Sequence, residues 1–210
     1  MDNKNQHYSS EFPDVKVKIH TISESLRRHL YIFKTVTGVF SFRKMDLGTK
    51  IFIEHMSIPE EPSVMLDLGC GYGPISIVLG YESPESIVYL IDINRHAIWC
   101  AKENVKINLM NNRNVHTLSG NYFEPIITKH LKFDGIYMNP PLRQGRKEFL
   151  KLVHGINSYL KSKGSFQFVI RKKMGAEYVL NYLKNEFPNN VVEIICKRGG
   201  YWVFRFFQEN

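Results

Sequence analysis

The feature that most constrains the fold is an alternation along the chain from Ser63 onward. Short apolar runs rich in β-branched residues alternate with longer segments that carry apolar residues at helical spacing. This alternation predicts an α/β sheet with helices on both faces. Strands are expected over residues 63–69, 86–92, 114–120, 133–139, 164–170, 191–197 and 201–207, and helices over residues 74–81, 95–109, 147–160 and 176–186.

The last two predicted strands are joined by a short link that contains Arg198, Gly199 and Gly200. A link this short fits an antiparallel pair, because parallel neighbours need a long crossover connection. The sequence therefore predicts a sheet of seven strands, six of them parallel and one antiparallel.

The residues before Ser63 do not follow this alternation. Residues 15–20 and 29–36 are expected to form a β-hairpin, and a helix is expected to begin near Thr49. No internal repeat, low-complexity tract or long linker separates this part from the rest. We therefore expect residues 1–60 to form a hairpin and helix extension, packed on a main domain of residues 61–210.

Positive charge is concentrated in the last third of the sequence. The net charge is +8, and residues 139–210 carry thirteen Lys and Arg against five Asp and Glu, whereas the charges of residues 1–138 cancel. A basic surface on this part would attract phosphate-rich partners. The alternative is a solvated basic face without a partner.

Several classes of protein are not expected from this sequence. No stretch has the roughly 18 uninterrupted apolar residues of a membrane span, and the first residues are too polar and acidic for a signal or transit peptide. Cys70, Cys100 and Cys196 lie far apart and the histidines are scattered, so neither a disulfide framework nor a metal site is predicted. We expect a cytoplasmic protein without membrane contact, and a monomer is favoured.

The stretch "LDLGCGYGP", residues 66–74, lies where the first predicted strand of the main domain turns into a helix. Gly69, Gly71 and Gly73 allow a tight turn and a close approach of the backbone to a ligand. The spacing differs from a dinucleotide fingerprint, which argues against a nicotinamide dehydrogenase. Asp67 would repel phosphate and favour a cation, and S-adenosylmethionine offers an ammonium and a sulfonium group with no phosphate.

A second carboxylate follows the glycine loop at the end of the next predicted strand. Asp92 can accept hydrogen bonds from both hydroxyls of a ribose, and Ile93 can pack on an adenine face. Gly120 and Asn121, at the end of the third strand, can reach the edge of the adenine. Together with the loop, these residues favour a nucleoside cofactor over a merely structural turn.

An unusual exit follows the fourth predicted strand in "DGIYMNPPLRQGR", residues 134–146. An exocyclic base amine has its lone pair delocalised into the ring, so it is a poor nucleophile until acceptors orient its hydrogens. The Asn139 side-chain oxygen and the Pro140 carbonyl can each accept one N–H, and the two prolines add no competing donor. Such fixed acceptors stabilise the positive charge that develops on nitrogen. A stiff strand exit without chemistry is the alternative.

The motifs "DLGCGYG", "LIDIN", "SGN" and "NPP", in this order, resemble the class I S-adenosylmethionine-dependent methyltransferases. The upstream stretch "GVFSFRKMDLGT" narrows the resemblance to the small-domain (MTS) superfamily, which includes enzymes that methylate the 2-amino group of guanine in small-subunit ribosomal RNA. The resemblance covers nearly everything from Gly38 to the C-terminus. It implies a Rossmann-like seven-stranded sheet, S-adenosylmethionine as cofactor, and ribosomal RNA or a small-subunit particle as partner.

The resemblance also implies roles for individual residues. The catalytic residues would be Asn139, Pro140, Pro141 and Leu142. The cofactor would be bound by Asp67, Gly69, Cys70, Gly71, Gly73, Asp92, Ile93, Asn121, Asn139 and Thr49, although Thr49 can equally be a helix N-cap and Cys70 merely a small residue that fits the loop. RNA contacts are expected at Phe40, Arg143, Arg146, Lys147, Arg171, Lys172 and Lys173. The alternative for Arg143, Arg146 and Lys147 is ordinary charge on the first turn of an exposed helix.

Leu142 departs from the pattern of the family. Many relatives have Tyr or Phe after the second proline, where the ring stacks on the target base, and such stacking contributes on the order of 1–3 kcal/mol. Phe40, Phe42 or Tyr72 can supply the missing ring, and alternating strand core is the alternative for both phenylalanines. Leu142 followed by Arg143 is compatible with the guanine-directed branch.

The leading expectation is an N-methyltransferase that acts on an exocyclic amino group of a base in RNA. The favoured target is the guanine 2-amino group of small-subunit ribosomal RNA. One alternative is a methyltransferase that acts on a glutamine amide of a protein, since this uses the same Asn-Pro-Pro chemistry. Another is a non-catalytic RNA-binding assembly factor with the same fold. The intact acceptors and glycine loop argue against the last of these.

Overall fold

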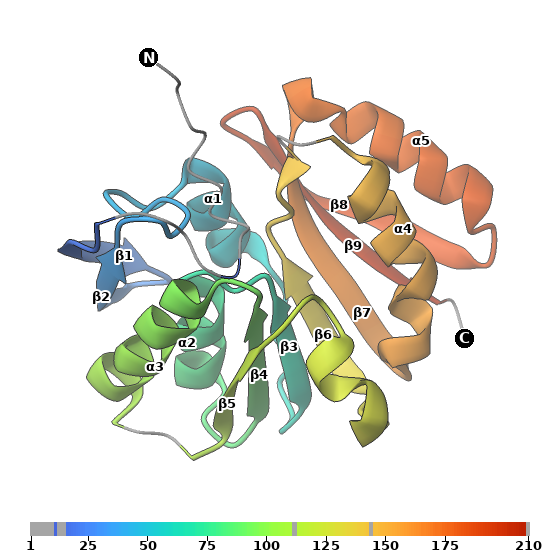
Figure 1. Ribbon diagram of the computed structural model, residues 1–210. Coiled ribbons are helices and arrows are strands. Elements are labelled where there is room, and N and C mark those ends of the chain that lie inside the picture. The colour runs from blue at the N-terminus through green and yellow to red at the C-terminus, as the bar shows by residue number, and fades with distance from the viewer. Residues whose placement is uncertain (1–10, 12–15, 111–112, 143–144, 209–210) are drawn as a thin grey trace.

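The computed structural model describes residues 11, 16–110, 113–142 and 145–208, and Figure 1 shows how their elements are arranged. A seven-stranded sheet with the order β5-β4-β3-β6-β7-β9-β8 forms the centre. Its strands are β3 (Val64–Leu68), β4 (Ile87–Asp92), β5 (Val115–Ser119), β6 (Phe133–Met138), β7 (Leu160–Arg171), β8 (Asn190–Arg198) and β9 (Tyr201–Gln208). Strand β9 is antiparallel to both β7 and β8, and the other neighbouring strands pair in parallel. The predicted sheet of six parallel strands and one antiparallel strand is therefore confirmed.

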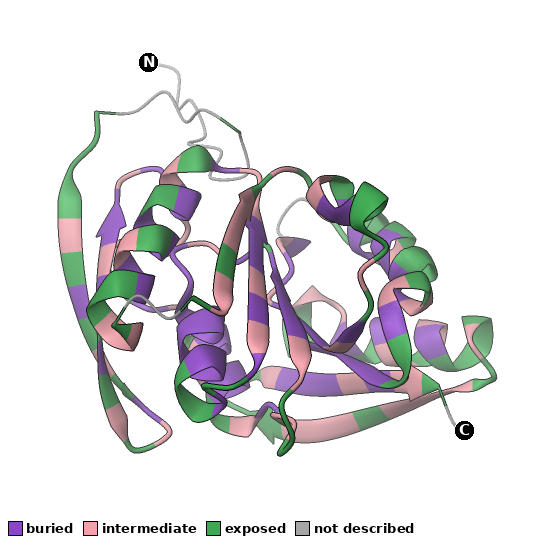
Figure 2. Cartoon of the chain, turned by 90° about the horizontal axis from the view of Figure 1, so that it is seen from below, coloured by how far each residue is buried: buried purple, intermediate pink, exposed green. Residues whose placement is uncertain are grey.

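Helices cover both faces of this sheet, as predicted. They are α1 (Leu47–His55), α2 (Pro74–Glu82), α3 (Arg95–Leu109), α4 (Lys147–Ile156) and α5 (Ala176–Glu186), with short 3-10 helices η1 (Glu124–Lys129), η3 (Asn157–Tyr159) and η4 (Lys172–Met174). Buried residues of α1, α2 and α3 belong to one apolar cluster, and those of η1, α4 and α5 belong to a second. Successive strand residues such as Met65 and Leu66 contribute to opposite clusters, so the sheet separates two cores. Figure 2 shows the buried centre of the sheet in purple.

Several predicted element boundaries differ from the structure, and for two of the helices the reason is local. The helix expected over residues 147–160 ends at Ile156, because Leu160 already pairs with Phe133 as the first residue of β7. Helix α1 begins at Leu47, before the expected start, because the Asp46 side chain accepts a hydrogen bond from the Thr49 N–H at 3.0 Å and caps the helix.

The N-terminal hairpin is formed by β1 (Ile19–Leu26) and β2 (His29–Val36), so the strand expected over residues 15–20 begins and ends too early. Arg27 and Arg28 have φ angles of 46° and 67° and form the two-residue turn. This turn sets Leu26 opposite His29, and the pairing continues from there to the pair of Ile19 and Val36. The register of the hairpin is thus determined by an Arg-Arg turn that carries none of the usual turn residues.

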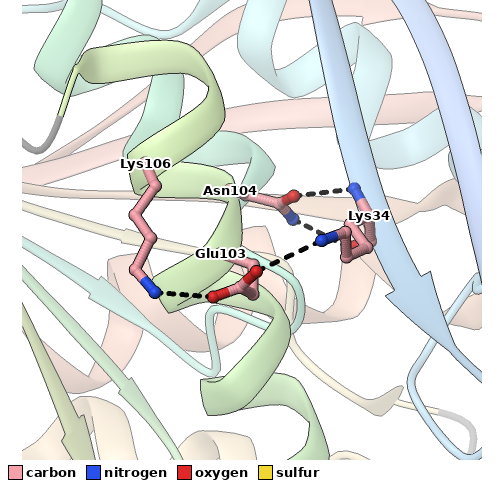
Figure 3. Close-up of polar contacts among 4 residues, drawn as sticks. All are labelled: Lys34, Glu103, Asn104 and Lys106. Atoms are coloured by element: carbon pink, nitrogen blue, oxygen red, sulfur yellow. Dashed lines mark hydrogen bonds and ion pairs between the residues drawn. The ribbon is translucent and has the colours of Figure 1, made fainter.

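Side-chain amides of helix α3 form hydrogen bonds with the edge of β2 that does not pair with β1. The Asn104 Oδ1 accepts the Lys34 N–H at 2.7 Å, and its amide donates to the Lys34 carbonyl at 2.9 Å and to the Tyr72 carbonyl at 2.8 Å. Figure 3 shows this pairing beside the ion pairs of Glu103 with Lys34, at 3.2 Å, and with Lys106, at 2.7 Å. Asn104 therefore connects the hairpin to the loop that precedes α2.

Two classes of feature are absent from the described part of the chain. No helix there has the length and apolar character needed to cross a membrane. Within the same residues, no group of three or more His, Cys, Asp or Glu side chains is arranged to hold a metal ion.

Candidate active site

A cavity of about 430 Å³ lies at the carboxyl ends of the parallel strands, where open α/β sheets bind their ligands. Most of the residues predicted for the site line it, namely Phe40, Thr49, Gly69, Cys70, Gly71, Tyr72, Asp92, Ile93, Gly120, Asn121, Asn139, Pro140, Pro141, Leu142 and Arg171. The glycine loop, the end of β4 and the Asn-Pro-Pro segment are far apart in sequence, and the strand order brings them to one place.

The glycine loop turns in the left-handed region at each of its three glycines. The φ angles of Gly69, Gly71 and Gly73 are 75°, 58° and 87°. A Cβ atom added to Gly69 or Gly71 would meet no heavy atom within 4 Å, so a side chain there would extend into open space that a ligand can use. A Cβ at Gly73 would lie 3.4 Å from the Ala101 Cβ, and Gly73 instead serves the packing of α2 on α3.

Asp92 connects the end of β4 to the glycine loop. Its Oδ2 accepts a hydrogen bond from the Gly71 N–H at 2.8 Å, and its Oδ1 accepts one from the Asn94 N–H at 2.8 Å. Burial raises the pKa of the Asp92 carboxyl above its ordinary value, although these two hydrogen bonds act in the opposite direction. Each carboxylate oxygen keeps a lone pair for a further donor, as the expected ribose contact requires.

Asp67 is placed differently from the expectation. Its side chain is fully buried behind the loop and does not line the cavity. The Ser76 N–H donates to the Asp67 Oδ2 at 3.1 Å, the Ser76 hydroxyl donates to the same oxygen, and the Oδ1 has no hydrogen-bond partner within the described residues. Burial raises the pKa of Asp67 to about 7, and the nearby Asp92 charge adds to this rise. Direct contact between Asp67 and a cationic ligand does not agree with this placement.

Asn139 is held by the start of helix α1. Its Nδ2 donates hydrogen bonds to the Thr49 Oγ1 at 2.8 Å and to the Asp46 Oδ2 at 3.3 Å. Asp46, and not Thr49, is the N-cap, so Thr49 contributes its hydroxyl to Asn139. Because both hydrogens of the amide are directed at α1, the side-chain oxygen is the atom of Asn139 that remains to accept a hydrogen bond from a substrate.

The rest of the Asn-Pro-Pro segment forms a tight turn. The Pro140 carbonyl already accepts the Leu142 N–H at 2.9 Å, so one of its two lone pairs remains for a further donor. Leu142 lines the cavity but is 8% exposed and packs with the core on the α4 side of the sheet.

The three aromatic residues considered for stacking on the target base differ in their access to the cavity. Phe40 lines the cavity, whereas Phe42 does not and packs against His20 with ring centroids 5.2 Å apart. Tyr72 reaches the cavity wall but is 3% exposed, and its ring packs edge-on against Phe33 at 5.6 Å.

Sequence reasoning did not identify Tyr201 and Tyr122, which also line the cavity. Tyr201 begins β9 and lies against α1, where a Cβ added to Gly48 would be 2.6 Å from the Tyr201 Cε1. Only the strand order, which puts β9 beside β7, brings this residue to the site. Tyr122 directly follows the expected adenine-edge residues, and its aromatic character next to Asn121 was the available signal.

Of the basic residues expected to contact RNA, Arg171 lines the cavity. The others within the described chain are exposed around this end of the sheet and do not line it: Arg146, Lys147, Lys172 and Lys173. Arg143 lies outside the described residues.

The sequence matches the methyltransferase small domain family over residues 30–205. It is 32% identical to the protein YbxB of Bacillus subtilis (strain 168), over 95% of this chain and 97% of that protein. It is also 32% identical to a ribosomal RNA small subunit methyltransferase C of Buchnera aphidicola subsp. Acyrthosiphon pisum, over 79% of this chain and 49% of that protein. The chain thus spans about half the length of that relative, and nearly the whole of YbxB.

A solved structure with the same fold is a 16S rRNA N2 methyltransferase of T. thermophilus, in complex with AdoMet and guanosine. The TM-score is 0.72 at 19% identity, over 94% of this chain and 52% of that one, and a likeness at this identity shows the fold alone. The family match covers most of the chain and includes the glycine loop, the end of β4 and the Asn-Pro-Pro segment. The chain therefore belongs to the methyltransferase small domain family.

Proposed function

We propose that this protein is an S-adenosylmethionine-dependent N-methyltransferase that acts on an exocyclic amino group of a base in RNA, with the guanine 2-amino group of small-subunit ribosomal RNA as its target. The observation that carries the proposal is the orientation of Asn139, whose amide hydrogens are bound by Thr49 and Asp46 while its oxygen remains as an acceptor at the cavity. The names of the relatives, among them several ribosomal RNA small subunit methyltransferases C, support the substrate class.

The residues present fit the proposed cofactor. The open space beside Gly69 and Gly71 allows a ligand to approach the loop backbone, and the Asp92 carboxylate offers acceptors for ribose hydroxyls. Ile93 and Asn121, which line the same cavity, are suited to an adenine ring and its polar edge. S-adenosylmethionine, when bound, supplies a methyl group on a positively charged sulfur.

The Asn-Pro-Pro segment supplies the acceptors that an aromatic amine needs. The Asn139 oxygen and the free lone pair of the Pro140 carbonyl each accept one N–H of the target amine. This holds the amine so that its lone pair is directed away from ring conjugation, and the two fixed dipoles stabilise the positive charge that develops on the nitrogen. The extra proton then passes to water, so no strong general base is required.

A flat apolar surface for the target base is available although Leu142 replaces the usual ring. Phe40 and Tyr201 both line the cavity, and Tyr201 lies against α1, which also holds Asn139. Stacking of a base on an aromatic side chain contributes on the order of 1–3 kcal/mol. In this proposal the Phe40 and Tyr201 rings stack on the target base in place of the residue after the second proline.

The division into an extension of residues 1–60 and a main domain of residues 61–210 is part of the proposal, with one addition. Asp46 and Thr49 come from the extension and bind Asn139 of the main domain. We propose that the extension is required for catalysis, since it fixes the orientation of the acceptor.

The test is transfer of tritiated methyl from S-adenosylmethionine to unmodified ribosomal RNA, free and in small-subunit particles, followed by nucleoside analysis. The Asn139→Ala variant is expected to lose roughly 10²–10³-fold in rate, as other enzymes do on removal of one transition-state hydrogen bond. Asn189→Ala, at an exposed position, is the matched control and retains full activity. Label in a protein amide in place of RNA would overturn the proposed substrate, and unchanged transfer by Asn139→Ala would overturn the mechanism.

A further inference from the structure

We propose that the paired surface of helices α4 and α5 beside the cavity binds single-stranded RNA that flanks the target nucleotide. The proposal rests on the proposed function for the identity of the nucleic acid. The surface consists of Arg146, Lys147 and His154 of the α4 side together with Tyr178 and Tyr182 of α5, and we call it the α4–α5 face. Figure 1 shows the two helices on the same side of the sheet.

The α4–α5 face carries two tyrosines in a stacked pair. The ring centroids of Tyr178 and Tyr182 are 6.2 Å apart with an interplanar angle of 21°, and Tyr178 is 50% exposed. The Arg146 guanidinium lies 4.5 Å from the Tyr178 ring centroid, and the His154 Nε2 and the Tyr182 hydroxyl share a hydrogen bond of 2.7 Å. Both rings are therefore oriented before any ligand binds, which lowers the entropy that binding must overcome.

The α4–α5 face begins at the edge of the cavity. Arg146 donates a hydrogen bond to the Met174 carbonyl at 3.5 Å, and Met174 lines the cavity. Glu148, in the first turn of α4, lines the cavity as well. When one nucleotide of an RNA strand enters the cavity, its neighbouring nucleotides would pass over the α4–α5 face.

The charge of the region favours a polyanion. The carboxylates of Glu148 and Glu177 are compensated by Lys151 at 3.0 Å and Lys172 at 3.3 Å. Arg146, Lys147 and Lys173 form no ion pair within the described residues, so positive charge remains in excess.

Exposed aromatic rings beside uncompensated cations are the combination by which proteins bind single strands, since every base has a face to stack and every nucleotide a phosphate. A protein partner is less favoured, because Tyr178 is the one large apolar side chain that is strongly exposed among the described residues of α4, η4 and α5.

The test measures the affinity of the full-length protein for a fluorescein-labelled single-stranded RNA of 12 nucleotides by fluorescence anisotropy. Tyr178→Ala is expected to weaken binding by about 5–150-fold, the equivalent of the 1–3 kcal/mol that one stacked base contributes. Tyr178→Phe keeps the ring and is expected to retain the affinity. Trp99→Ala is the matched control. Trp99 lies on α3, which packs on the opposite face of the sheet, and its 42% exposed ring has the Lys34 Nζ 6.0 Å from its centroid.

Charge is tested separately through the salt dependence of the same binding. Each cation that binds a phosphate of a single strand contributes roughly 0.7 to the slope of log K against log salt. Arg146→Ala or Lys147→Ala is therefore expected to lower the slope by about this amount. Lys102→Ala, an exposed lysine of α3, leaves the slope unchanged. Unchanged affinity in Tyr178→Ala, or no binding of the probe by the wild-type protein, overturns the inference.

The two proposals fail in different ways. A wild-type protein that methylates ribosomal RNA, with no loss of probe affinity in Tyr178→Ala, overturns the α4–α5 face and leaves the proposed function intact. A wild-type protein that binds the probe through Tyr178 but transfers no methyl group to RNA overturns the proposed function and supports the face as an RNA-binding surface.

Discussion

Asp67 shows at the scale of one residue how burial changes the chemistry of a side chain. Its carboxyl is fully buried, and Ser76 is its partner for one oxygen only. Desolvation raises the pKa of Asp67 from an ordinary 3.8 to about 7. Because the folded state disfavours the ionised form, the stability that Asp67 contributes is complete below pH 3.8 and is lost as the pH rises to about 7.

The first prediction concerns the loss of the stability contributed by Asp67 as the pH rises. The Asp67→Asn side chain cannot ionise, so we expect this variant to lack part of the pH dependence of the unfolding free energy. The wild-type protein should therefore lose stability relative to the variant between about pH 4 and pH 8. The expected loss is on the order of 1–4 kcal/mol. Thermal unfolding across this pH range measures it, with Glu60→Gln as an exposed control. Parallel curves for wild type and Asp67→Asn would contradict the placement of the carboxyl.

Two glycines in helices give a second prediction, because one is enclosed and the other is open. A Cβ at Gly48 would lie 2.6 Å from the Tyr201 Cε1 and 2.8 Å from the Asp46 Oδ2, whereas a Cβ at Gly155 meets nothing within 4 Å. Gly48→Ala should therefore destabilise the protein by about 1–3 kcal/mol. Gly155→Ala should stabilise it by up to about 1 kcal/mol, since alanine loses less backbone entropy in a helix. Urea unfolding of the two variants tests the contrast, and equal effects would argue against the contact of Tyr201 with α1.

At the scale of elements, helix α3 and strand β2 are joined by two asparagines in unlike surroundings. Asn104 is buried and bonds the Lys34 backbone and the Tyr72 carbonyl, and Asn108 makes the same backbone pairing with Ile32 in a more exposed position. Loss of a buried partner leaves backbone groups unsatisfied, whereas water replaces an exposed one.

The third prediction compares these two positions. Asn104→Ala should cost about 2–4 kcal/mol of unfolding free energy, and Asn108→Ala less than about 1 kcal/mol. Denaturant titration followed by circular dichroism measures both values. Because Asn104 also contacts the loop before α2, its variant should weaken cofactor binding too. Similar costs at the two positions would show that the hairpin is not anchored through Asn104.

The elements also show what could be predicted from the sequence. The alternation after Ser63 predicted every strand of the large sheet and the antiparallel position of its last strand, because periodicity and link length are local signals. The first strand of the hairpin lies later than predicted, because its position depends on an Arg-Arg turn without the usual turn residues. Helix α1 starts earlier than predicted, because its cap is Asp46, which the sequence pattern did not single out for that role.

The candidate site was predictable where its residues end parallel strands and not where they come from other elements. Gly71, Asp92 and Asn139 lie on the cavity as expected, since the carboxyl ends of parallel strands meet at one edge. Tyr201 was missed because β9 runs antiparallel and its first residue reaches this edge from the opposite direction. Asp67 was assigned to the ligand because the sequence does not reveal that its side chain turns toward Ser76.

At the scale of the whole molecule, the cavity joins parts that are separate in the chain. The extension supplies Phe40 and Thr49, the first half of the sheet supplies Gly71 and Asp92, and the second half supplies Asn139. A ligand that contacts all of them binds the folded state alone, because the unfolded chain cannot bring them together. Binding must then raise the unfolding temperature of the entire molecule.

The last prediction uses this linkage to test the proposed cofactor without measuring activity. S-adenosylmethionine at about 100 times its dissociation constant should stabilise the protein by about 2.7 kcal/mol. For a chain of 210 residues, this corresponds to a rise of about 5–10 °C in the unfolding temperature. Asp92→Ala should remove most of the rise, because it deletes the proposed ribose acceptors and the hydrogen bond to the Gly71 N–H. Asn139→Ala should keep most of it, since its principal role is with the substrate amine. Differential scanning calorimetry measures the shift of each variant relative to its own ligand-free form. A shift that Asp92→Ala retains in full would place the ligand elsewhere, because the contacts at the end of β4 would then contribute nothing to its binding.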